Sequence, residues 1–363
     1  MKRLLTIAFT IVLAFVVTTG FSQISKKQIK KNNKQMAKYK GNKNSFTSQK
    51  RYYYIGAGIN AMNYFGDIAP KSNIFSTKIG FTRPGFSGAF GYRIGPRYTL
   101  QASLSYGRLQ SDDNTAADPQ GDVSKFRYVR NLHFRNDIWE MAVVGIFDLF
   151  QNQGSYLSRV QITPYALIGI AGFHHNPKAI APETANNQQQ TPLAEAGQWV
   201  ALRPLGTEGQ YADLDPTDAN YGIKPYSLWQ MSIPFGLGAR YRLGEALDIS
   251  FDITFRWLFT DYIDDISRNY VDLGVLDGDL AKAMSDRSQE SVAAKTGNTR
   301  DLSAWPAVTY TGRDGQVYSV TNGFGSEHPS NKRGGASDND IYYVTSIKIS
   351  YILGSSFRRA KFR

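Results

Sequence analysis

One stretch of the sequence, Leu247 to Phe259, alternates between apolar and polar side chains along its whole length. Leucine, isoleucine, phenylalanine and tryptophan occupy one parity, while Asp248, Asp252 and Arg256 share the other with serine and threonine. A period of two predicts a β-strand with one apolar and one charged face. Such a strand suits a barrel whose aromatic face meets lipid, or a soluble barrel that turns the aromatic face inward.

The same period recurs along the chain and defines eight segments of strand length. The fourth segment changes parity near Ile138 and Trp139, which predicts a β-bulge, and the parity of the fifth is ambiguous. The predicted strands are Tyr52–Met62, Gly85–Gly95, Arg97–Leu109, Asn131–Phe150, Val160–Phe173, Ser227–Gly244, Leu247–Phe259 and Ile341–Leu353.

The connections between these strands alternate in length. Those after the second, fourth and sixth strands are short, while long loops cover residues 63–84, 110–130, 174–225 and 264–340. An even strand number with short turns at one end and long loops at the other is typical of outer-membrane barrels. We therefore predict an all-β fold: an eight-stranded antiparallel transmembrane β-barrel over residues 52–353, with long extracellular loops and a short periplasmic N-terminal arm.

Aromatic residues at the predicted strand ends favour the membrane barrel over a soluble, lipocalin-like one. Membrane barrels carry a girdle of aromatic side chains at each lipid–water interface. A soluble barrel would instead point these rings inward and expose the charged face. The predicted girdle consists of Tyr52, Tyr53, Tyr54, Trp257, Phe259, Tyr262, Tyr342 and Tyr343.

The positive charge of the chain is concentrated near its N-terminus. Residues 1–66 hold twelve lysines and arginines and no acid, so the remaining residues have 30 basic and 30 acidic side chains. Residues 1–22 have a basic start and an apolar core, which predicts a secretory signal peptide, with an uncleaved anchor as the alternative. Residues 23–51 predict a lysine-rich disordered arm, and residues 354–363 form a basic C-terminal tail. The neutral body argues against nucleic-acid binding.

An eight-stranded barrel has an interior just wide enough to be filled by side chains. The inward polar residues should therefore form a network of paired charges that closes the lumen, and a pore is not expected. The predicted lumen residues are Asp248, Asp252, Arg256, Arg240, Arg242 and Lys348.

Clustered carboxylates follow the opening strand at Asp261, Asp264 and Asp265. They could hold calcium, as could the acids of residues 213–218, but neither spacing matches a calcium loop. We interpret Asp261, Asp264 and Asp265 as a structural motif that fixes the base of the largest loop. Within that loop, Ala307–Thr321 predicts a hairpin around an Asp-Gly turn, and Asp279–Lys295 predicts a short amphipathic helix.

No sequence motif indicates an enzyme. The chain lacks a Gly-x-Ser-x-Gly, a His-Glu-x-x-His, a phosphate-binding loop and any Cys/His zinc pattern. His174 and His175 near the rim aspartates form the one constellation that could serve a barrel hydrolase. We predict no catalytic residue, no metal site and no cofactor.

Several short blocks follow one another along the chain: NYFGDI (63–68), RNLHFRNDIWE (130–140), TPYALIGIAGFHHNP (163–177), LGTEGQ (205–210), YSLWQMSIPFGLG (226–238), FTDYIDDISRNYVD (259–272) and SDRS (285–288). In their number and order these blocks resemble a known family, the PorG-like outer-membrane β-barrels of Bacteroidota. That resemblance implies an eight-stranded barrel associated with the type IX secretion and gliding apparatus, where the barrel meets a periplasmic ring containing a lipoprotein. It implies no catalytic residues.

The basic arm and tail are the predicted docking region for an acidic partner, which the resemblance identifies as the periplasmic ring or its lipoprotein. A tail lying on phospholipid headgroups and a plain spacer are the alternatives. For the barrel as a whole, the alternative to a role in secretion is to bind a surface ligand or protein through its extracellular loops. Lipid is a partner in every case, and the oligomeric state is left open. The docking candidates are Lys26, Lys27, Lys30, Lys31, Lys34, Arg358, Arg359 and Lys361.

Overall fold

The computed structural model describes residues 46, 50–68, 79–117, 119, 121, 124–337 and 339–353. The predicted signal peptide, all but the end of the basic arm, and the C-terminal tail lie outside these residues. The predicted docking candidates Lys26, Lys27, Lys30, Lys31, Lys34, Arg358, Arg359 and Lys361 therefore lie outside them as well.

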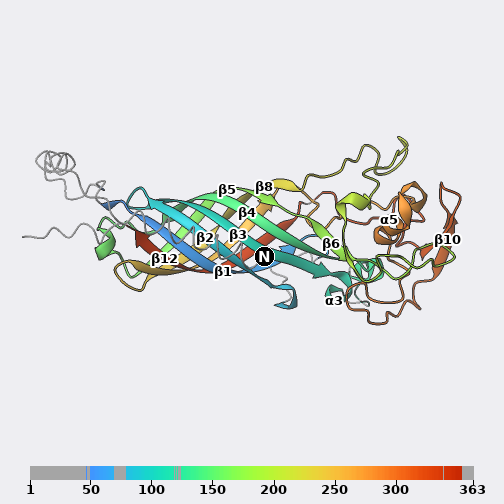
Figure 1. Cartoon of the computed structure of the whole chain (residues 1–363), viewed down its shortest axis with the longest axis horizontal. Coiled ribbons are helices and arrows are strands. Elements are labelled where there is room, and N and C mark those ends of the chain that lie inside the picture. The colour runs from blue at the N-terminus through green and yellow to red at the C-terminus, as the bar shows by residue number, and fades with distance from the viewer. Residues whose placement is uncertain are drawn as a thin grey trace, which may run out of the picture. The chain divides into compact units, whose positions relative to one another are not determined.

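Eight long strands form a closed antiparallel barrel, which confirms the predicted fold class. Each strand pairs with the next along the barrel, and the last, β12, pairs with the first, β1, to close it (Figure 1). The strands are β1 (Tyr53–Phe65), β2 (Arg83–Arg93), β3 (Tyr98–Asp112), β4 (His133–Asp148), β5 (Ile162–His174), β8 (Trp229–Arg242), β9 (Leu247–Leu258) and β12 (Ile341–Leu353).

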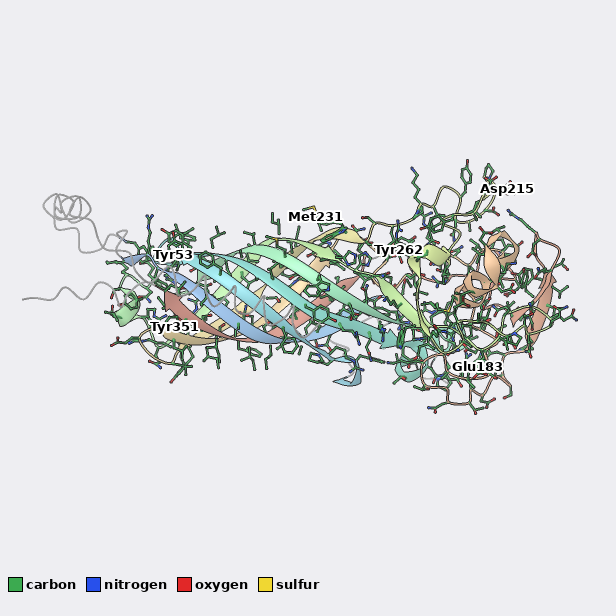
Figure 2. All side chains as sticks on the ribbon, in the orientation of Figure 1. Tyr53, Glu183, Asp215, Met231, Tyr262 and Tyr351 are labelled. Atoms are coloured by element: carbon green, nitrogen blue, oxygen red, sulfur yellow. The ribbon has the colours of Figure 1, made fainter. Side chains whose placement is uncertain are left out.

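The two faces of the barrel wall are opposite to those of a soluble barrel. Leu237 on β8 and Trp257 on β9 are 66% and 57% exposed, whereas Asp252 on β9 is fully buried inside. Apolar side chains cover the outer surface along the barrel strands (Figure 2). An apolar exterior around a charged interior is the arrangement of an outer-membrane barrel. No helix among the described residues is long and apolar enough to cross a membrane.

The bulge predicted in the fourth strand is absent. β3 and β4 pair in one unbroken register from Tyr98 opposite Phe147 to Asp112 opposite His133. The apparent change of parity comes from Ile138, which points inward and is buried in an apolar cluster with Leu109, Phe134 and Phe173. Near the long loops the barrel interior is therefore apolar rather than charged. This differs from the prediction that the inward side chains of the strands are polar.

The aromatic girdle differs in part from the prediction. Tyr53, Trp257 and Phe259 are exposed on the outer surface, as expected. Tyr52, Tyr54 and Tyr342 are buried and point inward, because they alternate with outward neighbours, and Tyr262 packs flat against Tyr226 in a loop, with ring centroids 4.8 Å apart. Exposed aromatics that were not predicted complete the two belts: Tyr98, Phe147, Tyr241, Tyr351, Trp139 and Trp229.

The short connections lie at one end of the barrel, which we call the short-turn end: residues 94–97, 149–161 and 243–246. Both described chain ends meet there, since Tyr53 pairs with Leu353. The connection 149–161 is longer than predicted and contains a 3-10 helix, η3 (Tyr156–Ser158). Its Tyr156 ring packs edge-on against Tyr52 at 6.4 Å between centroids. This connection folds across the mouth of the lumen instead of leaving it open.

The long loops form what we call the cap, the described residues of 113–132, 175–228 and 259–340. The predicted hairpin is present as β10 (Ala307–Thr311) and β11 (Val317–Thr321), whereas the predicted helix is shorter, α5 (Gly278–Ser285). Two short strands extend the sheet beside the start of β4: β6 (Pro177–Ile180) and β7 (Trp199–Ala201). The remaining elements are η2 (Ile79–Phe81), which precedes β2, and α3 (Asp113–Ala116), α4 (Lys125–Arg130), η4 (Arg203–Leu205) and η5 (Leu273–Val275) of the cap.

Candidate functional site

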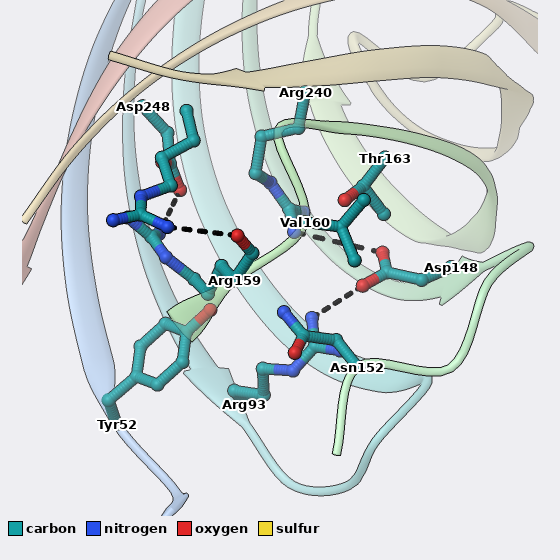
Figure 3. Close-up of a pocket in the computed structure, with 10 residues that line it drawn as sticks. Tyr52, Arg93, Asp148, Asn152, Arg159, Val160, Thr163, Arg240 and Asp248 are labelled. Carbon is teal, nitrogen blue, oxygen red and sulfur yellow. Dashed lines mark hydrogen bonds and ion pairs between the residues drawn. The ribbon is translucent and has the colours of Figure 1, made fainter. Parts of the chain in front are cut away.

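The lumen near the short-turn end is closed by a cluster of arginines and aspartates (Figure 3). Asp148 at the end of β4 accepts from Arg93 of β2 and lies 3.7 Å from Arg240 of β8. Arg159, from the connection 149–161, pairs with Asp248 at the start of β9. All these side chains are buried or nearly so, and because each carboxylate faces at least one guanidinium, the charges compensate one another.

A second layer of ion pairs fills the middle of the lumen. Arg256 of β9 forms a fork with both carboxylate oxygens of Glu140 on β4, each at 2.9 Å. The hydroxyl of Tyr342 donates to the same carboxylate, also at 2.9 Å. Asp252 of β9 pairs with Lys348 of β12. The fork joins β9 to β4 across the interior, although β8 and β5 separate them in the wall, whereas Asp252 and Lys348 lie on the paired neighbours β9 and β12.

Little space remains between these layers. The cavity in the middle of the lumen has a volume of about 40 Å³, and the one at the short-turn end about 10 Å³. A cavity needs at least about 10–15 Å³ to hold one water molecule. The lumen thus has room for a few waters and none for a solute.

The structure places all six predicted lumen residues on the inner face, but Arg242 plays a different part from the predicted one. Its guanidinium donates to the backbone carbonyls of Arg159 and Gly244, at 2.9 and 3.2 Å, instead of pairing with a carboxylate. The carboxylates Glu140 and Asp148 and the cations Arg93 and Arg159 were missed. Glu140 and Asp148 stand at inward positions of β4, so strand parity could have found them without the assumed bulge.

The predicted loop-base aspartates lie where the cap joins the barrel. Asp264 accepts a hydrogen bond from the Tyr64 hydroxyl at 2.6 Å, and Asp340, directly before β12, lies 2.7 Å from the same hydroxyl. Asp340 also accepts from the backbone N–H of Ile263 at 2.9 Å. The start and end of the longest loop are thereby held together over the end of β1.

Asp265 belongs to a separate buried cluster. Its carboxylate accepts from the hydroxyls of Thr207 and Tyr226, at 2.6 and 2.7 Å. The guanidinium of Arg333 donates to the backbone carbonyl of Asp265 at 2.6 Å and to the carboxylate of Glu208 at 3.1 Å. Burial raises the pKa of Asp265 to about 6. This cluster joins the two longest loops, 175–228 and 259–340.

The pKa of Asp261 is raised further than that of Asp265. Burial raises the pKa of Asp261 to about 9, and the nearby carboxylates of Asp264, Asp67 and Glu208 add to the effect. Burial also raises the pKa of Asp264 and of Asp340 well above the usual value, again with help from neighbouring carboxylates. A raised pKa favours the uncharged form of these acids, and Asp264 and Asp340 brace the loop by their hydrogen bonds with Tyr64 and Ile263.

The structure does not assemble an acid–base pair from the histidines. His175 is buried, with its Nε2 3.1 Å from the Ser227 carbonyl, and burial lowers its pKa to about 4. The His174 ring lies edge-on against the outer Trp229, 5.1 Å between centroids. Neither ring forms a hydrogen bond with a carboxylate in the described residues.

The other acidic stretch, residues 213–218, is engaged by an arginine. Arg313 from the β10–β11 turn pairs with Asp218 and lies 3.2 Å from Asp215. Across the part of the chain that the structure describes, no group of three or more histidine, aspartate or glutamate side chains is arranged to hold a metal ion.

By its strand pairing, outer apolar face and charge-filled lumen, the chain has an outer-membrane β-barrel fold. Residues 43–197 match the family described as a domain of unknown function, DUF6089. No curated protein matches the sequence.

The solved structures to which the chain is similar include several proteins of bacterial outer membranes. Ail, the attachment invasion locus protein of Yersinia pestis, is 7% identical, with 84% of this chain and 99% of that chain covered and a TM-score of 0.32. Neisserial surface protein A is 8% identical, with 82% and 96% covered and a TM-score of 0.32. A major outer membrane protein from Thermus thermophilus is 12% identical, with 83% and 99% covered and a TM-score of 0.34.

Proposed function

We propose that the protein is a non-enzymatic anchor of the outer membrane, with the barrel in lipid and the cap held on the outer side. The observation that carries this proposal is the pairing of an apolar outer wall with a lumen closed by ion pairs. A wall of this kind is stable only against lipid, because in water it would expose a continuous apolar surface. The test is heat modifiability: unboiled protein should migrate differently from boiled protein on a gel, and identical mobility would contradict the membrane barrel.

The cap supports an anchoring role over transport. It is held against the barrel end by buried contacts such as that of Tyr64 with Asp264, and its two longest loops are joined by the buried pair of Arg333 with Glu208. Ordered loops braced by buried charge pairs present a fixed surface, whereas the lumen beneath them has no room for a solute.

We further propose that the anchored complex is a protein-secretion apparatus of the type IX class. Three of the blocks that resemble the PorG-like family meet at the base of the cap. Glu208 of LGTEGQ accepts from the backbone N–H of Ser267 in FTDYIDDISRNYVD at 2.9 Å. The hydroxyl of Ser285 in SDRS donates to the Thr207 carbonyl at 2.6 Å. These blocks are far apart in the sequence but contact one another in the structure. Their contacts support the proposal that they form one structural motif shared with the family.

In this proposal the basic arm and tail dock an acidic partner on the periplasmic side, such as a ring that contains a lipoprotein. The pairing of Tyr53 with Leu353 supports a common site, because arm and tail both start from the short-turn end. Deletion of residues 24–50 should reduce co-purification of the ring with the barrel. The matched control replaces Lys26, Lys27, Lys30, Lys31 and Lys34 by glutamine at unchanged length. Loss in the deletion but full recovery in the control would show that length rather than charge matters, and unchanged recovery in both would refute docking by the arm.

A second candidate function is the binding of a surface ligand by the cap. A cavity of about 360 Å³ in the cap is lined by Asp218, Asp272, Tyr270 and Tyr310, among others. This volume is within the usual range of small-molecule sites. A strain that lacks the hairpin 307–321 and still secretes normally would favour this candidate over the secretion scaffold.

A further inference from the structure

A patch of charged side chains lies on the outer surface just beyond one of the aromatic belts. On β4 the outward positions run through Phe147 and Met141 to Trp139, which are exposed and apolar. The next two outward positions are Asp137 and Arg135. At about 3.4 Å per residue, they lie roughly 7 and 14 Å beyond Trp139 along the strand. Aromatic belts mark the level of the lipid headgroups, so these charges stand at or just above that level.

Two further basic residues join the patch from neighbouring strands. Arg108 of β3 is directly opposite Asp137 and forms an ion pair with it at 2.6 Å. Lys178 of β6 is directly opposite Arg135 in the pairing of β4 with β6, which extends the sheet beside the cap end of β4 (Figure 1). Opposite residues in an antiparallel pair project from the same face. The patch therefore contains three basic side chains and one acidic one.

The positive charges of Arg135 and Lys178 are not balanced by the protein around them. The guanidinium of Arg135 lies 4.1 Å from the centroid of the Trp199 ring on β7, which orients it without neutralising it. Asp137 is already engaged by Arg108. Within the described ranges, no carboxylate forms an ion pair with Arg135 or Lys178. Both are partly exposed on the outside of the barrel, so a negatively charged group from the surroundings can reach them.

We propose that Arg135 and Lys178, with Arg108, bind the phosphate of a phosphorylated lipid in the outer leaflet. A guanidinium recognises a phosphate through two parallel hydrogen bonds, and an ammonium adds a point charge. The exposed ring of Trp139, on the membrane side of Arg135, gives the acyl end of the same lipid an apolar contact, whereas Trp199, opposite Ile180 of β6, lies on the cap side of Arg135. This inference rests on the proposed membrane location and names a lipid that would fix the depth and rotation of the barrel.

The experiment titrates the full-length protein in detergent with diphosphoryl lipid A and measures the apparent Kd. The test variant is the double substitution Arg135→Gln and Lys178→Gln. The matched control, Lys224→Gln with Arg268→Gln, removes the same charge from exposed cap positions. Each basic residue near an anionic lipid surface is worth about 1 kcal/mol, so the test variant should bind roughly 30-fold more weakly while the control keeps the affinity of the unmodified protein.

Three results would overturn the proposal. The first is equal affinity of the test variant and the unmodified protein. The second is equal affinity for lipid A from which the phosphates have been removed. The third is competition by inorganic phosphate at the concentration of the lipid, which would indicate a site for a free anion. Gel mobility and insertion into vesicles are checked on the same samples: failure to insert refutes the membrane location, whereas insertion without phosphate dependence refutes only the lipid site.

Discussion

The hydroxyl of Tyr64 lies 2.6 Å from a carboxylate oxygen of Asp264 and 2.7 Å from one of Asp340. A tyrosine hydroxyl has one proton, so it can donate to only one of these two oxygens. The other contact is favourable only if its carboxyl group is protonated and donates to the tyrosine oxygen. The barrel and the longest loop are therefore joined by a pair of acids that shares at least one proton, and both acids are buried.

This arrangement predicts that the cap becomes less stable as the pH rises. Burial raises the pKa of Asp261 to about 9 and those of Asp264 and Asp340 well above the usual value. In the unfolded chain an aspartate carboxyl group has a pKa of about 4. The folded cap thus binds more protons than the unfolded cap from about pH 4 upward, and its stability declines as the pH approaches about 9. Near-ultraviolet circular dichroism should show a lower melting temperature of the cap at pH 9 than at pH 5.

Asp261→Asn provides the control for the pH dependence. Asparagine cannot ionise, so the variant should lose less stability between pH 5 and pH 9 than the unmodified protein. A melting temperature of the unmodified cap that is constant or rises over this interval would contradict the assignment of protonated acids at the loop base.

Tyr64→Phe should destabilise the cap by about 1–3 kcal/mol, because one oxygen of each buried carboxyl group, Asp264 and Asp340, loses the hydroxyl that it contacts. Chemical denaturation followed by near-ultraviolet circular dichroism measures the change. Tyr343→Phe is the matched control: Tyr343 lies on the outward face of β12, and its ring stacks on Phe65 at 5.3 Å between centroids. Equal effects of the two substitutions would show that the hydroxyl of Tyr64 has no special role.

Arg333→Met should have a larger effect, about 3–5 kcal/mol, because it leaves the buried carboxylate of Glu208 without its cation. Adding Glu208→Gln should restore part of the lost stability, since the unpaired charge is then removed. The exposed pair of Arg313 with Asp218 offers the comparison, and Arg313→Met should cost no more than about 1 kcal/mol. The same denaturation experiment covers all three variants, and a stable Arg333→Met cap would refute the bracing role.

The closed lumen predicts an absence of ion conductance. Purified protein inserted into a planar lipid bilayer should give no single-channel steps, because the forks of Arg256 with Glu140 and the pair of Arg159 with Asp248 fill the interior. An open porin added to the same bilayer is the positive control, because it should give conductance steps under the same conditions. Steady steps from the unmodified protein would show that the ion-pair layers open.

The barrel could be predicted from the sequence because the alternation of apolar and polar residues within each strand is enough to assign its two faces. The alternation in β9 separates Asp252 from Phe251 whatever the rest of the chain does. The same alternation led to the wrong prediction of a bulge at Ile138. The pattern within one strand cannot show that the barrel interior becomes apolar near the long loops. The contacts that brace the cap depend on tertiary structure: Tyr64 is 200 positions from Asp264 and 276 from Asp340. Arg159 was missed because it reaches the lumen from a connection and not from a strand.

Spin-label accessibility along β8 tests the membrane anchor most directly. The chain has no cysteine, so single cysteines can be introduced at Phe235 and Leu237 and, in the cap, at Thr309 without a background signal. In lipid vesicles, labels at Phe235 and Leu237 should collide more with oxygen than with a water-soluble nickel complex, and the label at Thr309 should show the reverse. Higher nickel than oxygen accessibility at Phe235 and Leu237 would mean that the apolar wall faces water, and the account of this protein as a membrane-embedded barrel would be wrong.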